Sequence, residues 1–227
     1  MRKMTFHIIT IFPKLFEPYL KESVIGRGMK KGIVSTKIYD LREFTKDKHQ
    51  QVDDKAYGGG PGMVLKIEPI VAALNKILRG KDKKKCLVIL TKPGGAQFTN
   101  KIAQGWSKKY KHIIILAGRY EGFDERIGAV LKDLKVDSKE LSIGSYVLTG
   151  GELPALVIVD VITRQIPGVL GKDESVEEKR YGIGVKAYTR PEVFKHKGKE
   201  YKVPKALLSG NHAEIEKWRL EHKDESN

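Results

Sequence analysis

The sequence is poor in three features, and each absence excludes a class of protein. It has one cysteine, Cys86, in 227 residues, which excludes a disulfide framework and any cysteine-rich zinc or iron–sulfur site. Its longest apolar runs, such as Leu153–Val159, fall far short of the ~20 residues that a membrane helix needs. The first residues are too polar for a signal peptide. We therefore expect a cytoplasmic protein with no membrane partner.

Acidic residues are also scarce relative to basic ones. Asp and Glu total 28 against 43 Lys and Arg, which gives a net charge of +15. A chain this basic is expected to meet a polyanion, and charge alone does not choose between nucleic acid and an anionic membrane. Between Lys76 and Lys111 the single acidic residue is Asp82. This stretch is either a solvated surface that maintains solubility or a surface that follows phosphates.

Strand-like and helix-like segments alternate along most of the chain. β-Branched or wholly apolar segments indicate strands, and apolar residues at helical spacing indicate helices. The expected strands cover 4–11, 34–39, 86–90, 112–116 and 141–146, and the expected helices 13–23, 68–78, 100–109, 124–131 and 151–163. This alternation predicts an α/β fold with a parallel sheet and helices on both faces.

The alternation ends near Pro167. Residues 172–186 are charged and show no apolar periodicity, which is typical of a linker or loop. We expect an α/β domain at 1–166, a mobile interdomain linker at 167–190 and a small, mainly helical C-terminal domain at 191–227. The last domain is predicted to carry a helix near His212–Glu221.

Three glycine-rich turns follow the C-terminal ends of expected strands. They are Pro93-Gly94-Gly95, Gly118–Gly122 and Ile143–Gly151. In open parallel sheets, ligands bind outside these strand ends. Turns of this kind present backbone N–H and C=O groups, which suit an adenine or a nucleoside. No Gly-x-Gly-x-x-Gly pattern follows an expected strand, so a dinucleotide site is disfavoured.

A fourth glycine-rich segment, Asp53–Gly62, is too dense in glycine for a helix or a central strand. It lacks the Gly-Lys-Ser/Thr of a phosphate-binding P-loop, so we reject a nucleoside triphosphatase of that type. It is either a plain flexible loop or a loop whose backbone approaches a ligand closely. In the second case Asp53, Asp54 and Tyr57 would supply polar and stacking groups.

Long motifs in sequence order carry a resemblance over nearly the whole chain. They are Tyr57–Met63, Gly118–Arg126, Ser142–Ala155, Ile166–Gly171, Tyr188–Pro191, Leu208–His212 and Lys217–Arg219. Together they resemble the bacterial tRNA (guanine-N1)-methyltransferases of the SPOUT class. The resemblance implies a C-terminal trefoil knot in the α/β domain, an exception to the unknotted rule. It also implies a homodimer with shared active sites and a reaction in which S-adenosylmethionine methylates the tRNA guanine 3′ of the anticodon, position 37.

The resemblance further implies two sets of binding residues. The methyl-donor pocket would comprise Pro93, Gly94, Gly118, Tyr120, Glu121, Ile143, Gly144, Ser145, Tyr146, Val147, Leu148, Gly150 and Gly151. The tRNA would meet Asp47, His49, Asp53, Tyr57, Gly59, Tyr188, Arg190 and His212, through stacking and phosphate contacts where the side chain is aromatic or basic. Similar enzymes depend on Mg²⁺, but no residue cluster has metal-ligand spacing. We expect tRNA rather than DNA as the partner.

This sequence departs from the family pattern near the expected pocket. Lys92 stands as an insertion beside the Thr-Pro-x-Gly turn, and Ser145 stands where the family usually has Asp. The chain also ends soon after Lys217–Arg219, earlier than the family's usual length. If main-chain groups bind the donor, the change at Ser145 matters little.

Methylation at guanine N1 requires an aligned donor methyl, a base for the N1 proton and a cation or donor toward O6. Arg164 matches the family's arginine before Ile-Pro-Gly and is our candidate for O6; the alternative is a solvent-exposed arginine at a helix end. Counting from Gly171 without gaps puts Lys179 at the family's catalytic Asp. A protonated lysine is not a base. We favour Glu178, shifted into place; Glu177, a base from elsewhere, or a slow or inactive chain are the alternatives.

Two other functions remain open on this sequence. A catalytically silent or retargeted RNA-binding protein with the same fold would accommodate Lys179. A related knotted methyltransferase could act on another RNA or on a ribose hydroxyl, although the length of the matching motifs disfavours it. Donor binding without turnover would indicate the first, and analysis of the modified nucleoside would separate the second.

Overall fold

The computed structural model describes residues 3–170 and 184–222. The chain divides into two compact units, Met1–Leu170 and Gly171–Asn227, and each is described by itself below. The candidate base Glu178, its alternative Glu177 and Lys179, which stands at the family's catalytic Asp position, lie outside the described residues.

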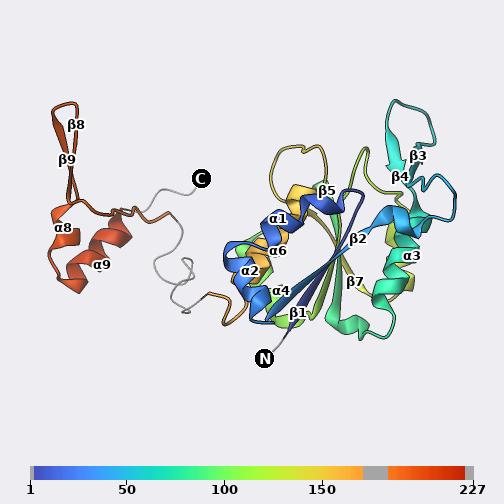
Figure 1. Cartoon of the computed structure of the whole chain (residues 1–227), viewed down its shortest axis with the longest axis horizontal. Coiled ribbons are helices and arrows are strands. Elements are labelled where there is room, and N and C mark those ends of the chain that lie inside the picture. Colours follow the sequence, from blue (N-terminus) through green and yellow to red (C-terminus); the bar gives the residue numbers. More distant parts are fainter. Residues whose placement is uncertain (1–2, 171–183, 223–227) are drawn as a thin grey trace. The chain divides into compact units, whose positions relative to one another are not determined.

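The larger unit is built on a parallel five-stranded sheet with the order β2-β1-β6-β5-β7 (Figure 1). Its strands are β1 Met4–Thr10, β2 Val34–Asp40, β5 Cys86–Gln97, β6 His112–Leu116 and β7 Asp137–Ser142. The parallel sheet of the predicted α/β fold is confirmed. The inner strands β1 and β6 and the first half of β5 are buried because helices cover both faces, as is usual for parallel sheets.

Side chains that alternate along the strands divide the core into two clusters. In β6, Ile113 and Ile115 face one cluster, and Ile114 and Leu116 face the other. The first cluster is covered by α1 Glu17–Leu20, α2 Ser23–Lys30, α4 Asn100–Lys109 and α6 Glu152–Arg164. The second is covered by α3 Ile67–Leu78 and α5 Ile127–Asp133. Short 3₁₀ turns at Pro13–Leu15, Leu41–Phe44 and Lys83–Lys85 complete the connections.

Some of the expected elements are wrong in position or continuity. The helix expected at 13–23 is broken into a 3₁₀ turn and α1, and α2 then starts at Ser23, whose φ of 51° interrupts a regular helix. The strand expected at 141–146 is β7, which runs from Asp137 to Ser142. It pairs with β5 alone, so its polar side chains face solvent and give no apolar signal.

The smaller unit combines a hairpin with two helices. Strands β8 Val193–His196 and β9 Lys199–Lys202 pair antiparallel, and α8 Lys205–Leu208 and α9 His212–Glu221 follow. The helix expected at 212–221 is confirmed. The Asn211 carboxamide oxygen caps it by accepting the backbone N–H of Ala213 at 3.1 Å. Across the described parts of both units, we find no helix with the length and apolar character needed to cross a bilayer.

Candidate functional site

A cavity of about 350 Å³ lies at the C-terminal ends of β5, β6 and β7. That volume is within the range of small-molecule sites. Its walls come from the three glycine-rich turns, and every residue predicted for the donor pocket lines it except Gly144 and Ser145. Thr91, Lys92, Arg119, Gly122, Glu125, Leu141, Ser142, Thr149 and Pro154 line it as well. The turns therefore converge as their positions after the strands indicated.

The first wall is a bulge inside β5. The pairing of β5 with β7 shifts register between Thr91 and Ala96, which pushes Lys92, Pro93 and Gly94 out of the sheet toward the cavity. A strand was expected to end at 90, but the chain rejoins the sheet and continues to Gln97. The bulge thus presents the backbone of the first turn while keeping both its ends fixed in the sheet.

Close backbone contacts hold the other two turns together. The N–H of Gly151 donates to the carbonyl of Gly118 at 2.7 Å, and the N–H of Gly118 donates to the Thr91 hydroxyl at 3.1 Å. A Cβ on Gly151 would lie 2.1 Å from Thr91 Oγ1 and 2.5 Å from the Gly118 nitrogen. Glycine is therefore required at 151 because any side chain would separate the three loops.

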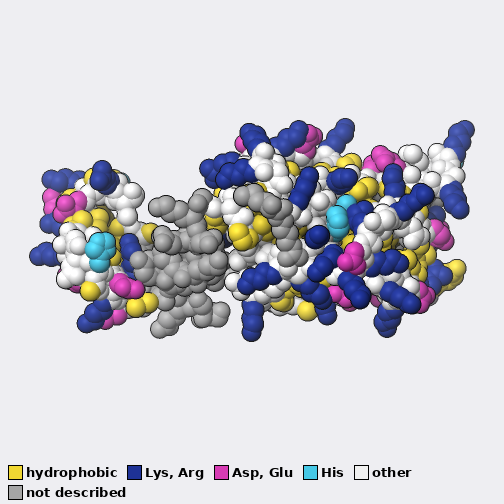
Figure 2. All heavy atoms as spheres, turned by 90° about the horizontal axis from the view of Figure 1, so that it is seen from below, with side chains coloured by type: hydrophobic (Ala, Val, Ile, Leu, Met, Phe, Trp, Pro, Cys, Tyr) yellow, Lys and Arg dark blue, Asp and Glu magenta, His cyan; other side chains and the backbone are white. Residues whose placement is uncertain are grey.

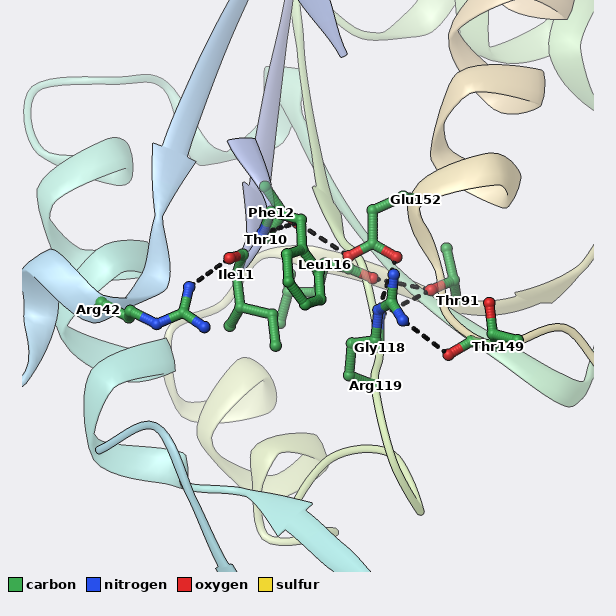
Figure 3. A network of polar contacts seen from close by, with 10 residues as sticks. All are labelled: Thr10, Ile11, Phe12, Arg42, Thr91, Leu116, Gly118, Arg119, Thr149 and Glu152. Atoms are coloured by element: carbon green, nitrogen blue, oxygen red, sulfur yellow. Dashed lines mark hydrogen bonds and ion pairs between the residues drawn. The ribbon is translucent and has the colours of Figure 1, made fainter. Parts of the chain in front are cut away.

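A buried carboxylate, Glu152, joins these loops to the end of β1 (Figure 3). Its Oε1 accepts the Thr10 hydroxyl at 2.9 Å, and its Oε2 accepts Arg119 Nε at 2.9 Å. The Arg119 guanidinium also donates to the Thr149 carbonyl at 3.1 Å and lies 4.5 Å from the Phe12 ring centre. The pair fixes the turn after β6 against the N-terminus of α6, on rigid elements of the fold.

Lys92 forms a second ionic link across the cavity wall. Its ammonium contacts Glu125 at 2.7 Å and Glu140 at 2.9 Å. Burial lowers the pKa of Lys92, but the hydrogen bonds to Glu125 and Glu140 outweigh it and raise the pKa above its ordinary value. This residue, an insertion in the sequence pattern, therefore stays charged and ties the β5 bulge to the neighbouring loop and to β7.

The glycine-rich segment at 53–62 is the tip of a hairpin that leans on the cavity loop. Strands β3 Asp53–Lys55 and β4 Met63–Leu65 pair antiparallel. The Glu121 N–H donates to the Met63 carbonyl, and the Leu65 N–H donates to the Gly122 carbonyl, both at 3.0 Å. Gly58, Gly59 and Gly60 all have positive φ, which explains the density of glycine.

The hairpin and the loop before it carry five of the predicted tRNA-contacting residues, namely Asp47, His49, Asp53, Tyr57 and Gly59. Tyr57 is fully exposed at the hairpin tip, and Asp53 is half-buried at its base. Asp47 and His49 lie in the exposed loop before the hairpin. The backbone N–H of Gln51 lowers the pKa of Asp47, helped by that of His49.

The remaining predicted residues lie elsewhere. Arg164 is the last residue of α6, and twelve helical steps of 1.5 Å place it about 18 Å from the cavity end of that helix. It does not line the cavity. Tyr188, Arg190 and His212 belong to the smaller unit and are exposed. Tyr188 packs edge-on against Trp218, with ring centres 5.9 Å apart.

The supporting residues of the cavity were missed at the sequence level. Thr10, Thr91, Arg119 and Glu152 act through contacts between positions that are 25 to 142 residues apart in the chain. Arg119 and Glu152 lie inside the motifs Gly118–Arg126 and Ser142–Ala155. Their place in these motifs was the one feature of the sequence that could have marked them as cavity residues. Within residues 3–170 and 184–222, no group of three or more His, Cys, Asp or Glu residues is arranged to hold a metal ion.

Comparison with known proteins gives one consistent result. The family model described as "tRNA (Guanine-1)-methyltransferase TrmD" matches residues 4–227. The chain is 46% identical over 215 residues to the tRNA (guanine-N(1)-)-methyltransferase of Dictyoglomus turgidum, covering 93% of this chain and 82% of that one. For the protein of the same description from Clostridioides difficile, identity is 45% over 221 residues, with coverage of 96% and 91%. For that from Geobacter sp. strain M21, identity is 44%, with coverage of 95% and 83%.

Proposed function

The chain belongs to the tRNA (guanine-1)-methyltransferase family, and on that premise we propose the reaction that its cavity serves. A methyl group passes from S-adenosylmethionine to N1 of the tRNA guanine at position 37, immediately 3′ of the anticodon. The observation that carries the proposal is the cavity at the ends of β5, β6 and β7, which is built from glycine-rich turns inside the span that the family model matches.

The donor fits this cavity by its chemistry. Backbone groups of Gly118–Gly122 and of the loop between Ser142 and Gly151 face the cavity from two sides. They can pair with an adenine edge, while apolar Leu148 and Ile143 cover its faces. S-adenosylmethionine supplies an electrophilic methyl group, and the chain's part is to hold it in line with guanine N1.

We assign the tRNA to surface residues of both units. In the larger unit these are the hairpin tip with Tyr57 and Gly59 and the residues Asp47, His49 and Asp53; in the smaller unit they are Tyr188, Arg190 and His212. Exposed aromatic rings suit stacking on unpaired bases, and the cations suit phosphates. In this proposal residues 191–227 form the tRNA-contacting domain and 167–190 the linker to it.

The position of Arg164 supports a homodimer. A guanidinium on a residue about 18 Å along α6 cannot reach a group bound at the other end of that helix. We propose that Arg164 of one subunit serves the cavity of the other, where it stabilises charge on guanine O6. Leu153 and Val157, one turn apart on α6, are 60% and 40% exposed, as expected for side chains that a second copy covers.

Two further features belong to the same proposal. The loop at 143–151 and α6 follow β7 and return beside β6 and β5, and we propose that this return forms the family's trefoil knot. Glu178 is proposed as the base for the N1 proton, since Lys179 replaces the family's aspartate. The resemblance also implies that the reaction depends on Mg²⁺.

The second candidate is a silent or retargeted RNA-binding protein. Lys179 at the expected base position is the observation that favours it. In that case the cavity would bind the donor and the surfaces would bind tRNA, but the N1 proton would stay in place.

A methyl-transfer assay separates the two candidates. The full chain is incubated with labelled S-adenosylmethionine and a tRNA transcript with guanines at 36 and 37, with Mg²⁺ or with EDTA. The products are then digested to nucleosides. We expect N1-methylguanine from this transcript and none from a control with adenine at 37. Donor and tRNA binding without product would reject the methyltransferase proposal in favour of the silent protein.

Glu178→Gln tests the base directly, with Glu177→Gln as its matched control. We expect the first to lower single-turnover methylation at least a hundredfold with donor affinity unchanged, because proton removal typically contributes that much or more. We expect the second to stay within about threefold of the parent. If the two variants keep equal, near-parental rates, the base lies elsewhere.

A further inference from the structure

The N-terminal edge of the sheet carries polar residues on the face that α3 covers. Register pairs Thr5 with Ser35 and with His112, and His7 with Lys37. Higher on the same face the strands are apolar, with Ile9, Ile114 and Leu116 in the second core cluster. Helix α3 ends at Leu78, and the polar residues lie at the edge beyond it.

Two histidines, His7 and His112, lie beneath this polar region. His7 Nε2 lies 3.3 Å from His112 Nδ1, and His7 Nδ1 lies 3.0 Å from the Tyr39 hydroxyl. His7 is buried, while His112 is half-buried and open toward the edge. These contacts leave His112 Nε2 directed away from the pair, as a donor or acceptor for a group outside the core.

Lysines from several elements stand around His112. Backbone hydrogen bonds align the chain segments before β5 and β6, with the Lys111 N–H donating to the Lys85 carbonyl at 2.9 Å. We define the basic edge as Lys37, Lys81, Lys83, Lys84, Lys85, Lys111 and His112. Burial lowers the pKa of His112, and Lys81, Lys111 and Lys37 lower it further. Each of the charged groups that shifts the pKa of His112 is therefore a lysine.

Two acidic residues near the edge, Asp137 and Asp82, make hydrogen bonds of their own. Asp137 accepts Lys109 at 2.8 Å and the Tyr110 hydroxyl at 2.7 Å. Asp82 accepts the backbone N–H of Lys84 at 3.0 Å. None of the six lysines of the basic edge has an ion pair within residues 3–170 and 184–222. Figure 2, the view from below Figure 1, shows many Lys and Arg side chains over this face of the larger unit, with fewer Asp and Glu side chains among them.

The basic edge is separate from the cavity. His112 begins β6, and Gly118 follows its end on the cavity wall, so about 20 Å of strand lies between them at ~3.3 Å per residue. No exposed large hydrophobic residue of the described chain belongs to the edge or adjoins it in sequence. A membrane surface would favour apolar side chains that insert beside the charges, whereas a phosphate backbone needs only the charges.

We propose that the basic edge binds the phosphate backbone of double-helical RNA, as a second RNA surface apart from the methyl-transfer cavity. The identity of that RNA as the substrate tRNA rests on the proposed function, but the surface itself does not. Lys37, Lys81 and Lys111 contact phosphates, and His112 donates between them. The contacts are independent of sequence because they reach phosphates and no base.

The test compares triple variants of the full chain in binding a fluorescent 20-base-pair RNA duplex that has no anticodon loop. We expect substitution of Lys37, Lys81 and Lys111 by Gln to raise Kd at least tenfold at 0.1 M salt. The slope of log K against log salt should fall by about 2, since each lost phosphate contact removes about 0.7–0.9. Lys83, Lys84 and Lys85→Gln is the second variant, in case the first perturbs folding.

Two controls separate a site from a general loss of charge. The same three positions changed to Arg should keep Kd within about threefold. Lys14, Lys21 and Lys101→Gln removes equal charge from the α1 and α4 side and should also stay within threefold. If the Gln substitutions at Lys37, Lys81 and Lys111 weaken binding no more than those at Lys14, Lys21 and Lys101, the basic edge is not an RNA site.

Further arms identify the ligand and keep this proposal distinct from the enzymatic one. Displacement of the duplex by 10 mM inorganic phosphate at constant ionic strength, or equal binding of phosphatidylserine vesicles, would overturn the RNA assignment.

With tRNA as substrate, we expect the edge variant to raise KM with kcat and donor affinity unchanged. If the parent binds the duplex through this edge but transfers no methyl group, the proposed function fails and the edge stands. If the chain transfers the methyl group but the edge substitutions leave duplex binding unchanged, the basic-edge proposal fails and the proposed function stands.

Discussion

At the scale of single residues, Gly151 is the position where the cavity tolerates least change. Gly151→Ala puts a Cβ 2.1 Å from Thr91 Oγ1, so we expect a loss of about 2 kcal/mol in the free energy of unfolding and a tenfold or greater loss of donor affinity. Urea unfolding and donor titration measure the two effects. The control is Gly105→Ala on exposed α4, where a Cβ meets nothing within 4 Å. That change should stabilise by about 0.5–1 kcal/mol, and a loss there would contradict the argument.

Arg119 is the second residue whose role can be isolated. Arg119→Met removes the partner of Glu152, whose side chain is 4% exposed. We expect about 3 kcal/mol of destabilisation, because a buried carboxylate keeps only the Thr10 hydroxyl. Adding Glu152→Gln removes the uncompensated charge, so the double variant should be more stable than Arg119→Met alone. A double variant as unstable as the sum of the single losses would show that the two side chains act independently.

The same residues show what sequence reasoning reached at the site. Gly118, Gly150 and Gly151 could be predicted to line a pocket, because glycine-rich turns after parallel strands allow the backbone to approach a ligand closely. Arg119 and Glu152 could not be paired, since a hydrogen bond across 33 residues leaves no local pattern. Gly144 and Ser145 were predicted to line the pocket because they lie within a matching motif. A motif does not record which way each residue of a loop faces.

At the scale of elements, burial decides which strands the sequence reveals. The β6 segment at 112–116 was predicted to the residue because four of its five side chains are fully buried. The edge strand β7 was misplaced since half of its residues are exposed. The hairpin β3–β4 was read as a loop because its two strands have three residues each, too few for a period-two pattern to appear.

The polar centre of β1 gives this sheet a pH-dependent stability. Burial, then His112, Lys81 and Lys37, lower the pKa of His7 from 6.5 to about 3. Between those values the unfolded chain binds a proton at this position that the folded chain does not. The free energy of unfolding therefore decreases as pH falls below about 6.5, by up to ~1.4 kcal/mol per pH unit. His112, whose pKa is also lowered, contributes in the same direction.

The test is urea unfolding at pH 7.5, 6 and 5 in a Trp218→Phe background, where Trp106 reports the larger unit alone. His7→Gln should be less stable at pH 7.5, because it loses the Tyr39 and His112 contacts. It should also lose stability less steeply between pH 6 and 5. A variant with the parent's slope would show that another group controls the pH dependence.

At the scale of the whole molecule, the proposed dimer makes a prediction that a single subunit cannot satisfy. Arg164→Ala removes the cation proposed for guanine O6 but leaves the cavity intact. Gly94→Phe is designed to fill the cavity, which Gly94 lines and where a Cβ at 94 would meet no atom within 4 Å, but leaves Arg164 intact. We expect each variant alone to lose at least a hundredfold in methyl transfer.

Co-expression of the two variants with different tags then decides which cavity Arg164 serves. If the sites are shared, each heterodimer has one intact site, formed by the cavity of the Arg164→Ala chain and Arg164 of the other chain. Purified heterodimers should then regain about half of the parent's activity per dimer, since a twofold dimer has two equivalent sites. If Arg164 served its own cavity, neither site would be complete. The heterodimer would then be as inactive as each single variant alone, and that result would exclude the shared active site.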